Sequence, residues 1–151
     1  MIWIAPDRVP PALSTPDFVL EPLGPEHNER DHRAWMSSID HIRATPGFGP
    51  GDWGNDAWPV AMSSAENLGD LQMHRREFEA GEAFAWSVLD HDGAVIGCVY
   101  IDPDPTGACE AVVRSWTTAQ AASLDVVLAD AIRAWIEDAW PIRSARFPGR
   151  T

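Results

Sequence analysis

The clearest pattern of apolar and polar positions lies near the end of the chain. Apolar residues recur at intervals of three and four from Leu124 to Ala139, with charged residues between them. This spacing predicts a helix with one apolar stripe, which Pro141 ends. Each larger buried side chain contributes roughly 1.5–3 kcal/mol, so we expect this helix to anchor the fold. The stripe comprises Leu124, Val127, Leu128, Ala131, Ile132, Trp135, Ile136 and Ala139.

Two further helices are predicted upstream. Three apolar residues from Trp35 to Ile42 share one helical face, which indicates a helix that begins near Glu26. Ser63-Ser-Ala-Glu66 has the form of a capping box, in which the serine and the glutamate bond to each other's main chain. The helix that this box opens is expected to end at Gly81.

Short apolar or alternating runs predict the strands, which cover residues 18–23, 83–89, 94–101, 108–116 and 143–147. His91-Asp92-Gly93 is a hairpin turn, since Asp-Gly adopts the backbone that tight hairpins need. The order β-α-α-β-β-β-α-β predicts an α+β fold with a central mixed, mostly antiparallel sheet flanked by helices. The last strand is expected to be parallel to its neighbour, because a helix connects them.

The pattern divides the chain into an arm and one domain. Residues 1–16 are expected to be an irregular arm, because prolines disfavour regular strands and helices. Residues 17–151 are expected to form a single domain, since a chain of 151 residues can bury one core. The loop from Thr45 to Pro59 is longer than usual, and long loops are often functional.

Composition narrows the partners. The formal charge is −12 and every basic side chain is arginine, which argues against nucleic acid and anionic membranes. The acidity favours cationic or neutral small ligands, or serves solubility alone. No apolar run approaches the ~18 residues of a membrane span. Cys98 and Cys109 make no metal pattern. A cytoplasmic protein with reduced thiols is expected, although a disulfide between these two across a hairpin stays open.

Four segments together resemble the GNAT N-acetyltransferase superfamily over about residues 17–148. They are Phe18-Val-Leu-Glu-Pro-Leu, Asp92-Gly-Ala-Val-Ile-Gly97-Cys-Val-Tyr, Glu110 to Trp116, and the helix from about Ser123. The resemblance implies that acetyl-CoA, or another acyl-CoA, inserts where the fourth strand splays from the fifth. Members usually continue past the fifth strand with a helix, which often carries a proton-donating tyrosine, and two more strands. The chain is therefore expected to be C-terminally truncated relative to the family.

The resemblance also implies where the cofactor binds. Gln120-Ala-Ala-Ser-Leu-Asp125 matches the family's phosphate loop, [QR]-x-x-G-x-[GA], except that Ser123 and Asp125 replace its two small residues. Asp125 either repels a phosphate, by about 1 to 4 kcal/mol at ~4 Å, or faces its own helix dipole. Arg114 either bonds to a phosphate or is a solvated, ion-paired side chain. The expected cofactor contacts are Val113, Arg114, Ser115, Trp116, Gln120, Ala121, Ala122, Ser123, Leu124 and Asp125.

Acyl transfer to an amine needs a base to remove a proton. Its position on the fourth strand favours Glu110 as this base, and the alternative is that Glu110 is simply an exposed carboxylate. Asp102 and His91 are weaker candidates, because they lie at turns, where polar residues are common. Tyr100 is a candidate acid or pocket residue, or a packed aromatic. Phe48, Trp53 and Trp58 either shape the acceptor pocket or hold the glycine-rich loop in place.

These residues support two hypotheses. The first is an acyl-CoA-dependent N-acyltransferase, with acetyl as the acyl group, on which a small amine attacks the thioester directly. The alternative is a non-catalytic GNAT-like module for ligand binding or dimerisation, because the phosphate loop lacks glycine. Eight tryptophans and an open sheet edge also suggest a homodimer.

Overall fold

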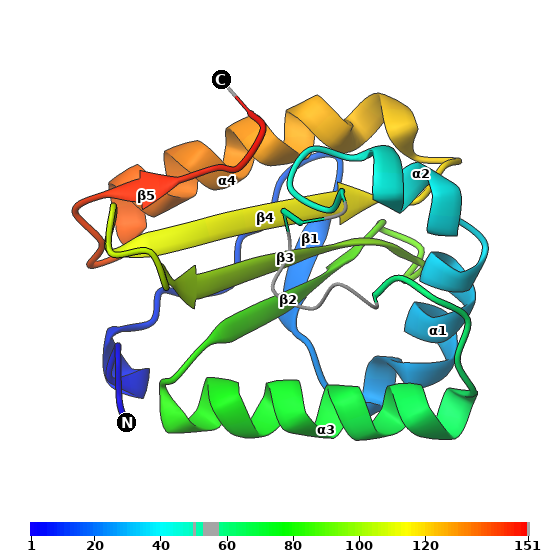
Figure 1. Cartoon of the computed structure of the whole chain (residues 1–151), viewed down its shortest axis with the longest axis horizontal. Coiled ribbons are helices and arrows are strands. Elements are labelled where there is room, and N and C mark those ends of the chain that lie inside the picture. The colour runs from blue at the N-terminus through cyan, green and yellow to red at the C-terminus, as the bar shows by residue number, and fades with distance from the viewer. Residues whose placement is uncertain (50, 53–57, 151) are drawn as a thin grey trace.

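A computed structural model of the chain describes residues 1–49, 51–52 and 58–150. Within these residues a five-stranded sheet has the order β1-β2-β3-β4-β5 (Figure 1). The first four strands are antiparallel neighbours, and β5 is parallel to β4. The strands are β1 (Val19–Pro22), β2 (Phe84–Leu89), β3 (Val95–Pro103), β4 (Ala111–Thr117) and β5 (Ala145–Arg146). The predicted α+β fold and the parallel last strand are confirmed.

Helices cover both faces of the sheet (Figure 1). One face packs against α4 (Asp125–Ala139), and the other packs against α1 (Asn28–Met36), α2 (Ile39–Ala44) and α3 (Ser64–Ala80). Among the described helices, none combines the length and the apolar character that crossing a membrane requires.

The α4 face holds a core rich in aromatic rings. Ile132 is 1% exposed, and Trp135 lies edge-on to Trp86 at a centroid distance of 5.2 Å. The predicted stripe is correct from Leu128 to Ile136 but wrong at both ends, where Val127 is 42% exposed and Ala139 is exposed. Figure 1 shows that the first turn of α4 lies beyond the tip of β4, so the strand against which the helix packs has already ended there.

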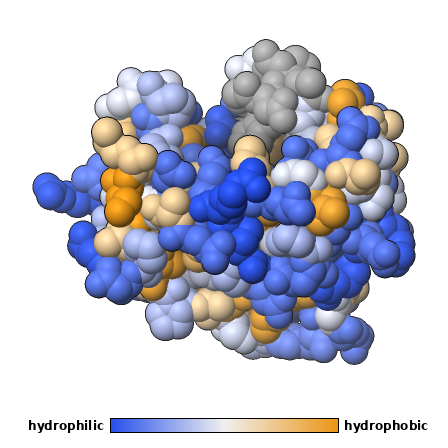
Figure 2. Space-filling view, turned by 90° about the horizontal axis from the view of Figure 1, so that it is seen from below, coloured by the Kyte–Doolittle hydropathy of each residue, from blue (hydrophilic) through white to orange (hydrophobic). Residues whose placement is uncertain are grey.

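The predicted caps of α3 are confirmed. The Glu66 N–H donates to Ser63 Oγ and the Ser63 N–H donates to Glu66 Oε1, both at 3.1 Å. Gly81 ends the helix in the left-handed conformation, with φ of 71°. The outer face that includes α3 is mostly polar, with scattered apolar residues (Figure 2). The inner face of α3 therefore supplies its contacts with the sheet.

The single helix predicted from Glu26 is in fact two helices, separated at Ser37 and Ser38. The Ser37 hydroxyl donates to Ala34 O at 2.8 Å, which satisfies a carbonyl at the end of α1. Ser38 is buried and leaves helical geometry, and its hydroxyl accepts the Ala119 N–H at 3.0 Å. A tertiary contact thus overrides the helical pattern and ties α1 to the loop before α4.

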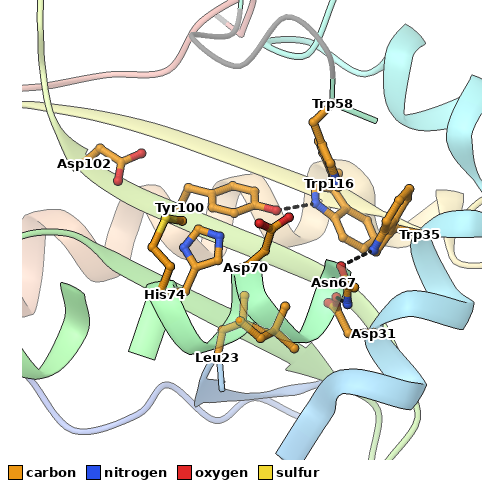
Figure 3. A pocket seen from close by; sticks show the side chains of 12 residues that line it. Leu23, Asp31, Trp35, Trp58, Asn67, Asp70, His74, Tyr100, Asp102 and Trp116 are labelled. Carbon is orange, nitrogen blue, oxygen red and sulfur yellow. Dashed lines mark hydrogen bonds between the residues drawn. The ribbon is translucent and has the colours of Figure 1, made fainter. Parts of the chain in front are cut away.

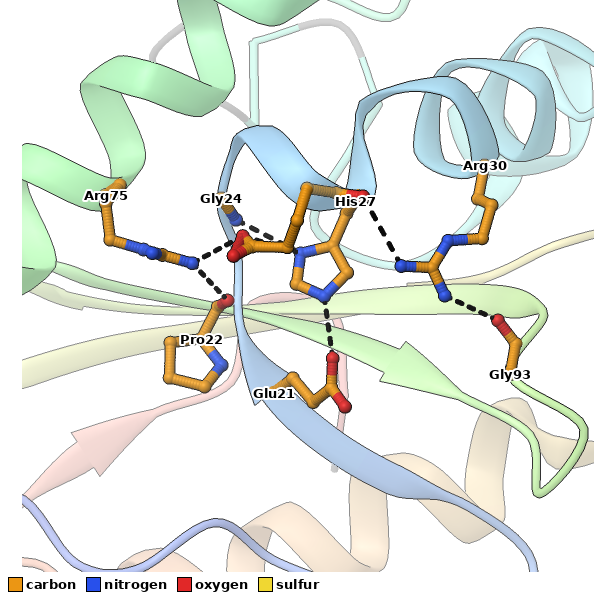
Figure 4. Close-up of polar contacts among 8 residues, drawn as sticks. Glu21, Pro22, Gly24, His27, Arg30, Arg75 and Gly93 are labelled. Carbon is orange, nitrogen blue, oxygen red and sulfur yellow. Dashed lines mark hydrogen bonds and ion pairs between the residues drawn. The ribbon is translucent and has the colours of Figure 1, made fainter.

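A buried histidine fixes the entry into α1 (Figure 4). His27 is 1% exposed, and its Nδ1 accepts the Gly24 N–H at 3.1 Å. Its Nε2 lies 2.8 Å from Glu21 Oε1 and is therefore assigned as the protonated nitrogen. Arg30 donates to Gly93 O at 2.8 Å and joins α1 to the β2–β3 hairpin. These contacts set the direction of the helix that carries the pocket residues.

The turn before β4 is longer than predicted, so that strand begins at Ala111. Asp104 organises the turn by accepting the Thr106 and Cys109 N–H groups, at 3.0 and 3.1 Å. It also binds Arg146 of β5 through two hydrogen bonds of 2.9 Å. Cys98 and Cys109 are both free thiols. The N-terminal arm contains one 3-10 turn, Pro6–Arg8, and is tied to Gly81 O by the N–H groups of Trp3 and Ile4.

Candidate functional site

A cavity of about 330 Å³ lies between the sheet and the inner faces of α1 and α3 (Figure 3). Its charged and polar lining consists of carboxylates, one amide, one imidazole and one phenol, and the rest is aromatic or aliphatic. No arginine lines it among the described residues. The lining comprises Leu23, Asp31, Trp35, Trp58, Asn67, Asp70, Leu71, Met73, His74, Tyr100, Asp102 and Trp116.

Local periodicity brings these residues together. Alternation along β3 turns Cys98, Tyr100 and Asp102 to the same face of the sheet. Antiparallel pairing sets Trp116 of β4 opposite Cys98. A side chain at Gly97 would run into the Trp116 carbonyl, so glycine allows the two strands to approach here.

The two helices contribute by the same reasoning. Asn67, Asp70 and His74 are spaced by three and four along α3, so they share the face that looks onto the sheet. Asp31 and Trp35 are one turn apart on α1. The sequence analysis missed Asp31, Asn67, Asp70 and His74. The i, i+3, i+7 spacing of polar residues on α3 was the available signal, but it reads equally well as a solvated face.

The Thr45–Pro59 loop supplies the remaining aromatic wall. Trp58 lies 5.5 Å from Trp35 and 6.1 Å from Trp116 between ring centroids. Phe48 is buried beneath it, 6.1 Å from Tyr100. Trp58 therefore lines this cavity and Phe48 supports it, and their role with an acceptor stays a prediction. Trp53 lies outside the described residues.

Asp31 is the most deeply buried carboxylate of the pocket. It is 4% exposed, and its Oδ2 accepts from Asn67 Nδ2 at 3.0 Å. Asn67 is fixed in turn, because its Oδ1 accepts the Trp35 indole N–H at 3.0 Å (Figure 3). Burial raises the pKa of Asp31 from 3.8 to about 6, which the Asn67 hydrogen bond opposes.

The other titratable groups are also shifted by burial. Desolvation raises the pKa of Asp102 to about 6, with Glu77 adding to the rise and Arg114 opposing it. It raises the pKa of Asp70 as well, and Glu66 contributes. It lowers the pKa of His74 to about 4, so the contact of 3.8 Å with Glu77 joins a neutral imidazole to a carboxylate. At neutral pH the lining is therefore anionic.

Tyr100 is brought to the centre of the pocket and Glu110 is not. The Tyr100 oxygen accepts the Trp116 indole N–H at 3.1 Å, and burial raises the pKa of the phenol well above 10. Glu110 precedes β4 and accepts the Arg143 N–H at 3.0 Å. It does not line the cavity, whereas Asp102 does.

The predicted cofactor strand separates from β5 after two pairs. β5 pairs with Ala111 and Val112, and β4 then continues to Thr117. The Ser115 carbonyl accepts a hydrogen bond from Arg150, so the main-chain groups of Ser115 point away from β3. Because main-chain direction alternates along a strand, those of Val113 and Thr117 also point away from β3. Arg114 instead donates to Gly47 O and Asp52 O, at 3.1 and 2.7 Å. It therefore holds the long loop rather than extending toward solvent.

Arg150 lies across the gap that this separation leaves. Its guanidinium donates to Ser115 O at 3.1 Å and forms two hydrogen bonds of 2.9 Å with the Asp125 carboxylate. The side chains of Arg150 and Asp125 are 12% and 19% exposed. The charge of Asp125 is thus paired within the protein, which the sequence analysis did not anticipate.

The predicted phosphate loop is a tight turn whose amides are largely used. The N–H groups of Ala121, Ala122 and Leu124 donate to carbonyls within the loop, at 3.1, 3.3 and 2.9 Å. Gln120 and Ser123 nevertheless border a second, more open cleft of about 820 Å³. Arg30 and Arg33 of α1 also line this cleft, together with Asp90 and Asp92 of the hairpin. Trp116, Val113 and Ser115 are buried in β4.

The comparisons with known proteins rest on structure. No protein-family model matches the chain, and no curated protein sequence matches it. RimL, a ribosomal L7/L12 alpha-N-protein acetyltransferase, superposes with a TM-score of 0.65 at 10% identity over 93% of this chain and 72% of its own. Mycobacterium smegmatis RimJ, solved with CoA-disulfide, gives 0.64 at 16% identity over 93% and 67%.

A third similar structure is FdhC, described as a nucleotide-linked sugar GNAT, with a TM-score of 0.61 at 8% identity over 92% of this chain and 72% of its own. All three superpose with TM-scores above 0.6 at identities of 16% or lower, so the likeness is one of fold. The chain therefore has the GNAT acetyltransferase fold.

Proposed function

We propose that the chain is an acyl-CoA-dependent N-acyltransferase that transfers an acetyl group to a small amine. The observation that carries this proposal is the anionic, aromatic cavity that lies against β3 and β4 of a GNAT fold. Its volume of about 330 Å³ is at the lower end of small-molecule sites. Carboxylates attract an ammonium group, and indole faces stabilise it.

Asp102 is the base in this proposal, in place of Glu110. A base works best when its pKa is near the operating pH, and the pKa of Asp102 is raised to about 6. Asp102 is only partly buried, so a proton that it accepts can leave to solvent. Tyr100, protonated at neutral pH, is the proton donor to the leaving group.

The donor would be held by groups along β4 and the loop after it. Val113 and Thr117 turn main-chain groups toward the gap, and Gln120 and Ser123 border the open cleft with Arg33. When bound, acyl-CoA supplies the activated thioester carbonyl. The fit is incomplete in one respect, because Arg150 occupies the Ser115 carbonyl.

The Arg150 contact is also what favours the second candidate function, a ligand-binding module without catalysis. If Arg150 stays on Ser115 O and Asp125, the gap between β4 and the following segment is filled. A titration of CoA followed by melting temperature separates the candidates. A CoA-binding acyltransferase is stabilised with the logarithm of the CoA concentration above its Kd, and a module with a filled gap shows no shift at millimolar CoA.

The test of activity is release of CoA thiol from acetyl-CoA in the presence of small amines. We expect Asp102→Asn to lower kcat/KM by about 10²- to 10⁴-fold, the usual contribution of a general base. Asp130→Asn, on the exposed face of α4, is the matched control, because it also removes one carboxylate charge. Loss of transfer in Glu110→Gln with retention in Asp102→Asn would reinstate Glu110 as the base.

A further inference from the structure

The cavity beside Tyr100 contains more negative charge than a single amine can neutralise. Asp31, Asp70 and Asp102 line it, no arginine does so among the described residues, and His74 is neutral at pH 7. Carboxylates of this kind are ordinarily paired when buried. Among the described residues, the only hydrogen bond to the Asp31 carboxylate comes from the neutral amide of Asn67.

Acyl transfer increases this excess of negative charge in the cavity. The attacking nitrogen must be uncharged when it attacks, and it becomes a neutral amide in the product. A monoamine would therefore lose its positive charge during the reaction and leave the carboxylates without a counter-ion. An acceptor with a second basic nitrogen keeps one positive charge throughout.

The carboxylates are also placed for two different tasks. Asp31 and Asp102 lie toward opposite sides of the cavity in Figure 3, with Tyr100 and Asp70 between them. Asp31 is almost fully buried and held by Asn67, which also accepts the Trp35 indole N–H, so an indole lies at this end of the cavity. This end suits a cation that stays charged. Asp102 is more exposed and suits proton removal.

We propose that the acceptor is a compact organic diamine, with one ammonium retained at Asp31 and the other nitrogen acylated near Asp102. The assignment of the diamine as acyl acceptor rests on the proposed function, whereas its binding to the cavity does not. A cavity of about 330 Å³ corresponds to roughly ten water volumes, so the diamine has on the order of ten non-hydrogen atoms. In the reaction, the amine forms a C–N bond with the acetyl carbon as the C–S bond breaks. The amine proton goes to Asp102, and the thiolate receives one from Tyr100.

The test measures binding without any acyl donor. Trp35, Trp58 and Trp116 line the cavity, so intrinsic fluorescence and calorimetry both report on it. The probes are two matched pairs, 1,4-diaminobutane with butylamine, and 1,4-bis(aminomethyl)benzene with benzylamine. We expect each diamine to bind about tenfold more tightly than its monoamine at low salt.

Asp31→Asn should abolish this preference while the protein remains folded, and Asp130→Asn should retain it. Equal affinity for diamines and monoamines in the wild-type protein would overturn the proposal, as would a preference that survives in Asp31→Asn. The two proposals fail separately. Diamine binding without any CoA release removes the acyltransferase, and faster acylation of the monoamines removes the diamine class alone.

Discussion

Replacing Asp31 with asparagine should make the protein more stable at neutral pH. The carboxylate is 4% exposed, and burial raises its pKa from 3.8 to about 6. One pKa unit corresponds to ~1.4 kcal/mol, so the ionised group costs up to about 3 kcal/mol in the folded state. Asparagine has the same shape, carries no charge and can still accept from Asn67 through its oxygen.

The pH dependence has a definite sign. Because the folded protein holds the Asp31 proton more tightly than the unfolded chain does, this group makes stability fall as pH rises from about 4 to 6. His27 and His32 beside it on the chain, Asp70 of α3 and Cys98 of β3 face the same group, and Asn67 donates to it. Asp31→Asn should remove the contribution of Asp31 to the fall in unfolding free energy between about pH 4 and pH 6.

Urea unfolding at pH 4.5 and at pH 7 measures both effects. We expect the variant to gain about 1–3 kcal/mol over the wild-type protein at pH 7 and little at the lower pH. Asp130→Asn, at an exposed site, serves as the control for a change in net charge. A variant that is less stable than wild type at pH 7 would refute the reasoning, since it would show that the charge of Asp31 is already compensated within the protein.

Other residues give further predictions. Ile132→Ala in α4 should cost about 2–5 kcal/mol of unfolding free energy in urea titrations, because the side chain is 1% exposed in the core. Ser63→Ala should cost about 1 kcal/mol by the same measurement, because it removes the capping box of α3. Asp125→Asn should bind CoA about fivefold more tightly by calorimetry, because it frees Arg150 from its ion pair; weaker binding would show that Asp125 supports the cofactor site. Amine acetylation should decline below pH about 6 as Asp102 takes up a proton, with Glu77 and Arg114 setting that pKa; a flat profile from pH 5 to 7 would exclude Asp102 as the base.

The elements with strong local signals were predictable. The capping box at Ser63, the Asp-Gly hairpin and the continuous apolar run of β3 each depend on neighbouring residues, and the structure contains all three. The break at Ser38 was not predictable, because it depends on a hydrogen bond to Ala119, far away in the sequence. The exposure of Val127 depends on where α4 overhangs the sheet, which its own periodicity does not contain.

In the candidate site, too, features set by local sequence were predictable and features set by tertiary contacts were not. Tyr100 and Trp58 were identified from residue type and position, and both line the cavity. Asp31 was missed, because a charged residue in a helix is usually solvated, and its burial arises only when α1 packs on α3. Arg150 was missed for a similar reason, since its partner Asp125 lies on a different element.

The central claim is that the cavity beside Asp31 and Tyr100 is where the acceptor reacts. The most direct measurement is the initial rate of CoA release from saturating acetyl-CoA as a function of 1,4-diaminobutane, set beside the binding curve of the same diamine. The account predicts a saturable rate, and it predicts that Asp31→Asn shifts the half-saturating concentration and the dissociation constant together, to weaker values. The account would be contradicted if Asp31→Asn lost diamine binding to the cavity but kept the half-saturating concentration of the rate. The reaction would then take place elsewhere.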